Sequence, residues 1–191
     1  MAMLELRLMD EEQIRLLYDQ SLSRDFPPSE LKSLSAILHM HRRREYDVLG
    51  VYESNAFVGY ALVYCPRNQR LALLDYFAVE PAYRRQGLGG TILKLLRMHY
   101  GNSTDALLIE CERPKSAPDE MEARKRIQFY TQAGAVLTRV RIWLFGVEYS
   151  ILVLPCAQEI PDCDWAGQMV LMYKQMLPDE LFRANVRLLQ S

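Results

Sequence analysis

The chain has 191 residues, half of them apolar and a quarter charged, which fits one globular domain with a full core. Its 23 lysines and arginines nearly balance 24 aspartates and glutamates, so charge argues against a nucleic-acid, membrane or strongly acidic partner. Four widely spaced cysteines without a Cys-x-x-Cys pair predict thiols in a reducing compartment and no metal site. With no apolar leader and no run of membrane-spanning length, the sequence predicts a cytoplasmic protein.

The first part of the chain predicts a strand, two helices and an antiparallel hairpin. Leu4 to Met9 alternates apolar and charged residues like a half-buried strand, and Asp10 is a good N-cap for the helix that follows. Pro27 and Pro28 interrupt the helical pattern, and Ser29 is the expected cap of the second helix. The hairpin strands are expected at Asp47–Glu53 and Phe57–Cys65, joined by a turn at Ser54 and Asn55.

The central stretch predicts a strand, a glycine-rich loop and a helix. An apolar run from Leu71 to Val79 ends at Glu80 and Pro81, and a helical pattern then continues to near Gly101. The segment Gln86–Gly90 therefore falls at a helix N-terminus, where backbone N–H groups lack intrahelical partners and the helix dipole favours an anion. Glycine there would let the main chain approach a bulky phosphate.

The rest of the chain predicts a further strand, a helix, a closing hairpin and two C-terminal helices. The strand Ala106–Cys111 follows a helical crossover, so it should pair in parallel with the central strand and make the sheet mixed. The expected helix after Asp119 ends at Gly134, and the hairpin strands are Ala135–Phe145 and Val147–Leu154.

Beyond the closing hairpin the pattern changes to helical. One predicted helix carries an apolar stripe of Met169, Met172, Tyr173 and Met176, and a second runs from Asp179 to Leu189. We therefore expect one domain at residues 1–154 and a C-terminal helical extension at residues 155–191. Either the extension packs on its own domain, or it contacts a partner subunit in a homodimer.

Two motifs carry a resemblance to a known family. A dinucleotide fingerprint needs glycine or alanine where Ile92 stands, and a Walker loop needs Gly-Lys-Ser/Thr, so neither fits. The segment Arg84-Arg85-Gln86-Gly87-Leu88-Gly89, preceded by Val-x-Pro, resembles the acyl-CoA pyrophosphate loop of the GNAT superfamily of N-acetyltransferases. The segment from Arg126 to Ala135 contains Phe129-Tyr130 followed by Gly134 and is similar to that superfamily's Phe-Tyr-x-x-x-Gly-Phe segment.

The resemblance covers roughly residues 4–154 and implies a fold and a cofactor. The implied fold is the α/β (α+β) GNAT fold, with a mixed, mostly antiparallel sheet of about six or seven strands flanked by helices. The implied co-substrate is acetyl-CoA. Its expected contacts come from main-chain groups of the central strand, from the glycine loop and from the second motif: Phe77, Ala78, Val79, Arg84, Arg85, Gln86, Gly87, Leu88, Gly89, Gly90, Thr91 and Tyr130.

Acetyl transfer also needs an acid and a base. Tyr130 aligns with the tyrosine that the family often uses as general acid toward the coenzyme A thiolate, and its alternative role is an interior tyrosine. Carboxylates on the central strand and its neighbour are the candidate bases, namely Asp75, Glu110 and Glu112, with Glu110 preferred and an ion-pair role as the alternative. The resemblance further implies that Asp25, Phe26 and Pro27 touch the acceptor, unless they form a plain turn between helices.

The leading hypothesis is an acetyl-CoA-dependent N-acetyltransferase that acts on a primary amine of a small molecule. The alternatives are a non-catalytic acyl-CoA-binding or regulatory protein, an enzyme that acetylates a peptide or protein amine, and an interaction protein that uses the C-terminal helices. The glycine loop together with Tyr130 favours the enzyme. No motif identifies the acceptor.

Overall fold

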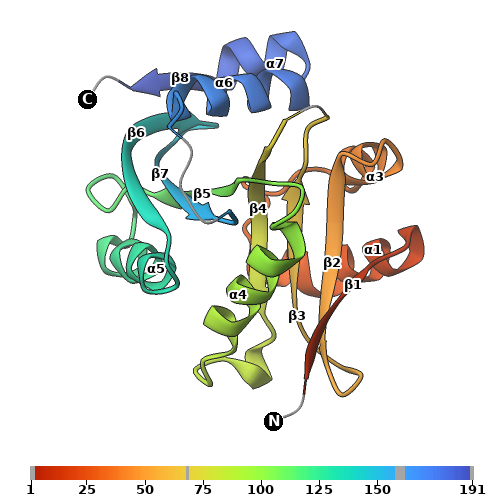
Figure 1. Cartoon of the computed structure of the whole chain (residues 1–191). Helices are drawn as coiled ribbons and strands as arrows, with labels where there is room; N and C mark the ends of the chain where they lie inside the picture. The colour runs from red at the N-terminus through yellow and green to blue at the C-terminus, as the bar shows by residue number, and fades with distance from the viewer. Residues whose placement is uncertain (1–2, 68, 158–161, 190–191) are drawn as a thin grey trace. The chain divides into compact units, whose positions relative to one another are not determined.

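The computed structural model describes residues 3–67, 69–157 and 162–189. The chain divides into two compact units, Met1–His99 and Tyr100–Ser191 (Figure 1). Within each unit four strands pair in antiparallel fashion, and helices pack on them. Every helix in the described ranges is too short or too polar to span a bilayer.

The sheet of the first unit has four antiparallel strands in sequential order. They are β1 (Leu4–Leu8), β2 (Tyr46–Glu53), β3 (Ala56–Tyr64) and β4 (Leu71–Val79). The predicted hairpin is confirmed, because Ser54 and Asn55 both adopt left-handed φ angles, 48° and 70°, and turn β2 into β3. The buried residues of β2 and β3 supply much of this unit's core.

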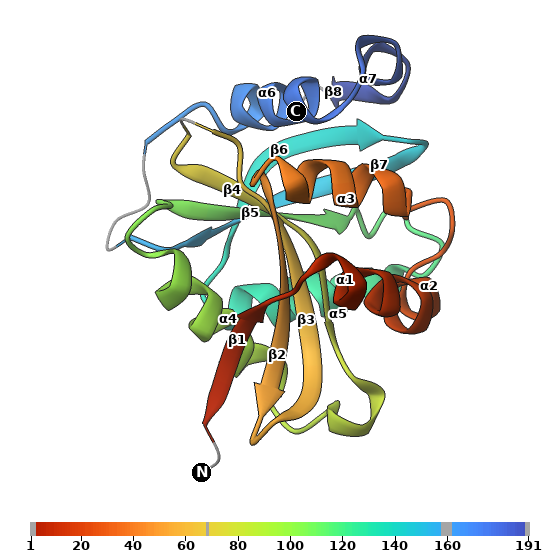
Figure 2. The ribbon, with the colours of Figure 1, turned by 90° about the vertical axis from the view of Figure 1, so that its right-hand side faces the viewer.

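Helices cover both faces of this sheet. They are α1 (Glu11–Leu17), a π-helical turn η1 (Tyr18–Leu22), α2 (Ser23–Asp25), α3 (Leu34–Arg42), a 3₁₀ turn η2 (Pro81–Tyr83) and α4 (Leu88–Tyr100). Figure 2 shows α1, α2 and α3 on one face of β1, β2 and β3, and α4 on the other. The predicted cap of the first helix is confirmed: Asp10 Oδ1 accepts from the Gln13 N–H at 2.9 Å, and Gln13 Oε1 accepts from the Asp10 N–H at 3.0 Å.

The cap predicted for the second helix is wrong by one turn. Ser33, not Ser29, caps α3, and its hydroxyl accepts from the Ala36 N–H at 3.2 Å. The Tyr76 hydroxyl of β4 explains the difference, because it donates to the Glu30 carbonyl at 2.8 Å and accepts from the Lys32 N–H at 2.9 Å. Those backbone groups are thus held in a non-helical conformation by a residue that lies far away in sequence.

The second unit contains the remaining strands and helices. The strands are β5 (Ala106–Glu112), β6 (Val136–Leu144), β7 (Val147–Pro155) and β8 (Val186–Leu189), and the helices are α5 (Glu120–Gln132), α6 (Trp165–Met176) and α7 (Asp179–Asn185). The strands are antiparallel in the order β5-β7-β6-β8, so the predicted closing hairpin β6–β7 is confirmed. The predicted parallel pair of β4 and β5 would join the two units and stays a prediction.

The predicted helix from Asp179 to Leu189 is wrong in its second half. The helix α7 ends at Asn185, and Val186–Leu189 forms β8, which pairs with residues 141–144 of β6. The strand count is therefore eight among the described residues, where six or seven were expected. An open strand edge favours extended backbone in a neighbouring segment, because pairing satisfies the N–H and C=O groups of both.

Part of the apolar stripe of the C-terminal segment is buried. Met169 and Met172 are fully buried and Tyr173 nearly so, and α6 packs against β6 and β8. The described part of residues 155–191 thus lies inside the second compact unit. Its separate status as an extension stays a prediction, and residues 158–161 at its start lie outside the described residues.

Candidate active site

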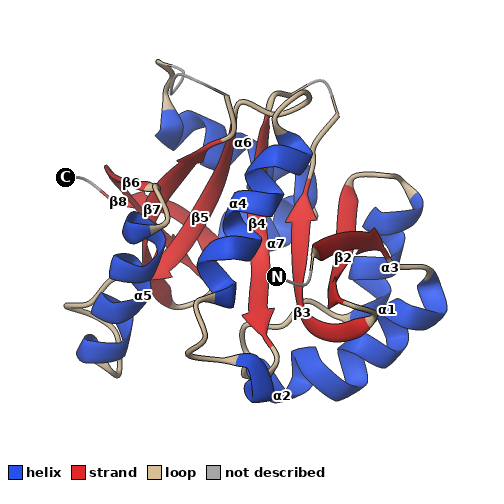
Figure 3. Ribbon diagram, turned by 60° about the horizontal axis from the view of Figure 1, so that its bottom comes forward, coloured by secondary structure: helices blue, strands red, loops and turns tan. Residues whose placement is uncertain are grey.

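The predicted strand–loop–helix stretch is confirmed in the first unit. The loop between β4 and α4 begins with the 3₁₀ turn η2 and then passes through Arg85 and Gly87, both in left-handed conformations with φ of 62° and 77° (Figure 3). The glycine adopts this conformation without the steric cost that a side chain brings. These two residues turn the chain so that α4 begins at Leu88, directly after the loop.

Backbone N–H groups at the start of α4 are the groups predicted to bind an anion. The first intrahelical bond runs from the Thr91 N–H to the Gly87 carbonyl at 3.4 Å. For the N–H groups of Leu88, Gly89 and Gly90, the described residues provide no acceptor. Thirteen residues of aligned peptide dipoles lie behind these groups, which makes a negative charge favourable there.

The space in front of these amides is open. A Cβ atom built on Gly87 or Gly90 would meet nothing within 4 Å. A bulky anion can therefore approach the main chain closely at the two positions where a side chain would stand in its way. The loop fits the pyrophosphate of coenzyme A in this respect.

The two arginines of the loop have different surroundings. Arg84 donates from Nε to the Val79 carbonyl and from its terminal nitrogen to Asp25 Oδ1, both at 2.8 Å. Arg85 is exposed and forms no ion pair or hydrogen bond with any described residue. Only the second arginine thus presents an uncommitted positive charge beside the helix N-terminus.

Asp25 lies in a cluster of ion pairs beside the loop. Its side chain is only 8% exposed and accepts from Arg24, Tyr60 and Arg84. Burial by itself raises the pKa of Asp25, but the hydrogen bonds from Arg24, Tyr60 and Arg84 outweigh it and leave the pKa below its ordinary value. The carboxylate expected at the acceptor is therefore charged and already engaged by two guanidinium groups.

Residues Phe77, Ala78 and Val79 are the last three of β4, and β3 pairs along one edge of them. The two strands approach so closely that a Cβ on Gly59 would lie 2.7 Å from the Ala78 carbonyl oxygen. That contact explains the glycine in β3. The main-chain contacts of these three residues with pantetheine stay a prediction.

Asp75, one candidate base, forms a buried ion pair. A register shift opposite Leu62 and Val63 leaves Asp75 as the extra residue of a β-bulge in β4. Its side chain is 5% exposed, lies 2.8 Å from Lys32 Nζ and accepts a hydrogen bond from the Tyr46 hydroxyl. With a lysine already bound, Asp75 is poorly placed to accept a proton from a substrate amine.

The second unit holds Tyr130 on α5, and this residue is 8% exposed. Burial raises its pKa, the neighbouring Cys111 adds to that shift, and the positive charge of Arg126 reduces it. The phenol therefore stays protonated at neutral pH and can act as a donor. Buried tyrosines usually have a hydrogen-bond partner, yet none of the described residues bonds the Tyr130 hydroxyl.

The remaining candidate bases differ in their partners. The Tyr173 hydroxyl donates to Glu110 Oε2 at 2.9 Å, whereas Glu112 lies 3.5 Å from Arg126 of α5. Because neighbouring residues of a strand point to opposite faces, Glu110 faces α6 and Cys111 faces α5 and Tyr130. The sequence does not reveal the Tyr173 contact, because α6 carries no catalytic motif.

These candidate residues fall into two groups by unit. The glycine loop and the end of β4 belong to the first unit, and Tyr130 and Glu110 belong to the second. The action of the two groups at one reacting centre stays a prediction. In the described ranges, no group of three or more histidines, cysteines or acidic residues could hold a metal ion.

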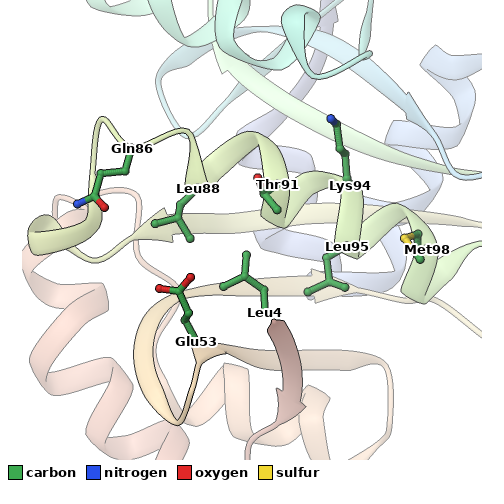
Figure 4. A pocket seen from close by; sticks show the side chains of 8 residues that line it. All are labelled: Leu4, Glu53, Gln86, Leu88, Thr91, Lys94, Leu95 and Met98. Carbon is green, nitrogen blue, oxygen red and sulfur yellow. The ribbon is translucent and has the colours of Figure 1, made fainter. Parts of the chain in front are cut away.

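A groove beside the loop was not found by sequence reasoning. Its volume is about 480 Å³, and it is lined by Leu4, Glu53, Gln86, Leu88, Thr91, Lys94, Leu95 and Met98. Figure 4 shows Leu88 and Leu95 pointing from α4 toward Leu4 of β1. Its walls come from segments far apart in the sequence, and none of those outside the loop carries a motif that marks a site.

Comparison with protein families identifies the central part of the chain. Residues 44–134 match the acetyltransferase (GNAT) domain, a range that includes the glycine loop, Glu110 and Tyr130. No curated protein shows a significant match to the chain.

Solved structures share the fold at low sequence identity. An acetyltransferase assigned to the GNAT family from Bacteroides thetaiotaomicron is 19% identical, with a TM-score of 0.71 over 89% of this chain and 96% of that one. The ribosomal-protein-S18-alanine N-acetyltransferase from Escherichia coli is 18% identical, with a TM-score of 0.61 over 85% and 100%. A chimera of the spermidine N-acetyltransferase from Vibrio cholerae is 11% identical, with a TM-score of 0.60 over 80% and 95%. The GNAT fold predicted from the two motifs is confirmed.

Proposed function

The chain carries a GNAT acetyltransferase domain, and we propose that it transfers an acetyl group from acetyl-CoA to a primary amine of a small molecule. The observation that carries this proposal is the start of α4. Its first N–H groups have no acceptor among the described residues, and open space lies over Gly87 and Gly90. Such an arrangement suits the pyrophosphate of coenzyme A.

In this proposal the loop holds the phosphates by main-chain groups. Each charge-assisted N–H bond contributes about 1.5–3 kcal/mol, and the helix N-terminus adds about 0.3–2 kcal/mol. Several such bonds from Gln86 to Gly90 are enough for binding in the micromolar range. Arg85, which is exposed and uncommitted, adds a positive charge next to them.

Acetyl-CoA, when bound, supplies the thioester whose acyl carbon the amine attacks. The chain then has two proton transfers to manage. Tyr130 is the proposed donor to the departing thiolate, since its buried phenol stays protonated at neutral pH. Glu110 is the proposed acceptor of the amine proton, directly or through water, since Asp75 is held by Lys32.

A small-molecule amine is the proposed acceptor. The structural similarity to a spermidine N-acetyltransferase supports this class at the level of the fold. The fold also occurs in the enzyme named for the alanine of ribosomal protein S18, so a peptide amine is the alternative that the experiment must include. We further propose a cytoplasmic location, supported by four cysteines that form no disulfide although all four are described.

The test measures cofactor binding first and turnover second. Acetyl-CoA and free CoA should raise the melting temperature, whereas NAD and ATP should do so much less. Gly89→Glu places a side chain and a negative charge at the loop and should abolish the shift. A panel of polyamines, aminoglycosides and short peptides is then screened for release of free thiol from acetyl-CoA. Binding without thiol release for any amine would leave a non-catalytic acyl-CoA-binding protein. An unchanged shift in Gly89→Glu would refute the proposed loop.

A further inference from the structure

A cluster of two arginines and two carboxylates lies beside the glycine loop. It consists of Arg24, Asp25, Glu80 and Arg84, all in the first unit. We propose that Asp25 is a positioning residue: it holds the glycine loop in its binding conformation through Arg84, without touching the cofactor itself. This inference rests on the proposed binding of acetyl-CoA.

The Asp25 carboxylate is fully engaged. Oδ1 accepts from Arg24 Nε at 3.1 Å and from Arg84 at 2.8 Å. Oδ2 accepts from Arg24 at 2.8 Å and from the Tyr60 hydroxyl at 2.9 Å. Four donors on one buried carboxylate fix its position, and Tyr60, which lies in β3 and is fully buried, ties it to the sheet.

Arg84 transmits this position to the loop. Its planar guanidinium donates from Nε to the Val79 carbonyl and from a terminal nitrogen to Asp25 Oδ1. Val79 is the last residue of β4, and Arg84 is the first residue of the Arg-x-x-Gly-x-Gly motif. The Arg84 side chain therefore links the end of β4 to the loop. A shift of Asp25 would displace the guanidinium and disturb this link.

Glu80 reinforces the same connection from the other end of the turn. Oε1 of Glu80 accepts from the Ser21 hydroxyl at 3.0 Å and from Arg24 at 3.0 Å. Ser21 and Arg24 lie on the π-helical turn η1 and on α2, directly before Asp25. Two residues of the loop region, Glu80 and Arg84, are thus bound to one short stretch that continues into the segment expected at the acceptor.

The loop needs such support because of its backbone. Arg85 has a φ of 62°, which is unfavourable for a residue with a side chain, and it follows Arg84 directly. A strained conformation persists only where neighbouring contacts fix it. The bonds from Arg84 to Asp25 and Val79 are the contacts next to Arg85 that do so.

The test compares Asp25→Asn with a matched control. Asp25→Asn keeps the shape of the side chain and removes the charge that binds Arg84. Glu45→Gln is the control, because Glu45 is 10% exposed, lies between Arg43 and Arg67, and belongs to the same unit without contact to the loop. Each protein is titrated with free CoA by calorimetry, and its melting temperature is measured without ligand.

Asp25→Asn should raise the Kd for CoA by about tenfold or more, since small misplacements of binding groups are costly. Glu45→Gln should bind CoA like the wild type while losing similar thermal stability. With an accepted amine, the KM for acetyl-CoA should rise in Asp25→Asn and stay at the wild-type value in Glu45→Gln. A Kd within twofold of the wild type, or an equal loss in both variants, would overturn the inference. A wild type that binds no CoA would instead refute the proposed function.

Arg84→Lys provides a second measurement if Asp25→Asn does not fold. Lysine keeps the positive charge near the proposed phosphate site but cannot bridge Asp25 and Val79 as the guanidinium does. Weaker CoA binding in Arg84→Lys supports the positioning role. Wild-type affinity in this variant would show that only the charge matters and would contradict the role assigned to Asp25.

Discussion

The hydroxyl of Tyr173 donates a hydrogen bond to Oε2 of Glu110 at 2.9 Å, so a residue of the C-terminal helix α6 orients a carboxylate of β5. Tyr173 is buried, and a hydrogen bond in the protein interior is stronger than the same bond in water. The bond therefore holds the carboxylate in a fixed orientation. This relationship distinguishes Glu110 from the neighbouring candidates. Asp75 lies in an ion pair with Lys32, and Glu112 lies 3.5 Å from Arg126.

Glu110→Gln is expected to lower the turnover number by about 10²–10⁴, the usual contribution of a positioned general base, while CoA affinity changes little. Glu112→Gln removes the same charge two residues along the same strand, where Arg126 is the partner. We expect a much smaller effect there. Steady-state kinetics with an accepted amine compares the two variants, and a larger loss in Glu112→Gln would transfer the assignment to Glu112.

Gly90→Ala should separate stability from cofactor binding. An added Cβ meets nothing within 4 Å, and alanine is favoured over glycine in a helix by up to about 1 kcal/mol, so the melting temperature should stay constant or rise. CoA binding should weaken at least tenfold, because the methyl group occupies space proposed for the phosphates. Calorimetry with CoA measures this, and unchanged affinity would place the phosphates elsewhere.

Gly87→Ala is the companion variant. The φ of Gly87 is 77°, and a side chain in that conformation costs roughly 1–2 kcal/mol. Its melting temperature should therefore fall even without ligand. The contrast between the two glycines would show which one the fold requires and which one the ligand requires.

Local patterns predicted the features that local physics determines. The change from a two-residue to a 3.6-residue period placed the loop before Leu88, and the N-cap at Asp10 is present as expected. The hairpin between β2 and β3 was predicted because Ser54 and Asn55 tolerate left-handed conformations.

Features that depend on distant residues were not predicted. Serine is a common helix cap, so Ser29 was the expected one. Hydrogen bonds between the Tyr76 hydroxyl and the backbone before Ser33 keep that segment out of the helix. The end of the chain carries a helical pattern up to Leu189, but the edge of β6 pairs with it from Val186 onward. The engagement of Asp25 by Arg84 joins residues 59 positions apart, and no periodicity reveals it.

Deleting residues 158–191 should remove most soluble protein. The deletion takes away α6, α7 and β8, and with them the buried side chains of Met169, Met172 and Tyr173. Full burial of one such side chain contributes about 1.5–3 kcal/mol, so three approach the whole stability of a typical domain. The apolar surface uncovered by the loss of α6 would promote aggregation.

A shorter deletion of residues 186–191 is the control for this experiment. It removes β8 but keeps α6 and its buried residues, so the protein should stay soluble with a lower melting temperature. Size-exclusion chromatography and thermal melting measure both truncations. A soluble monomer with native melting after the longer deletion would show that the C-terminal segment is dispensable.

Tyr130→Phe tests whether Tyr130 acts as the general acid or is only a residue of the core. The change removes one oxygen and keeps the ring, which lies against Phe129 with ring centroids 5.0 Å apart. None of the described residues bonds the hydroxyl, so its removal leaves no buried partner unsatisfied. The loss of stability should therefore be well below the roughly 1–3 kcal/mol that an unsatisfied buried polar group costs. If the phenol protonates the departing thiolate, the turnover number should fall by about 10²–10⁴ while CoA affinity stays constant.

Tyr64→Phe is the matched control for that prediction. Tyr64 is also buried, its pKa is also raised by burial, and it lies on β3 of the first unit, away from the loop. Removal of the Tyr64 hydroxyl oxygen should leave the turnover number unchanged. Both variants are compared at several pH values, because a missing general acid lowers the rate throughout the range in which the phenol is protonated. Wild-type turnover in Tyr130→Phe would leave thiolate protonation to water or another residue, without affecting the case for the glycine loop.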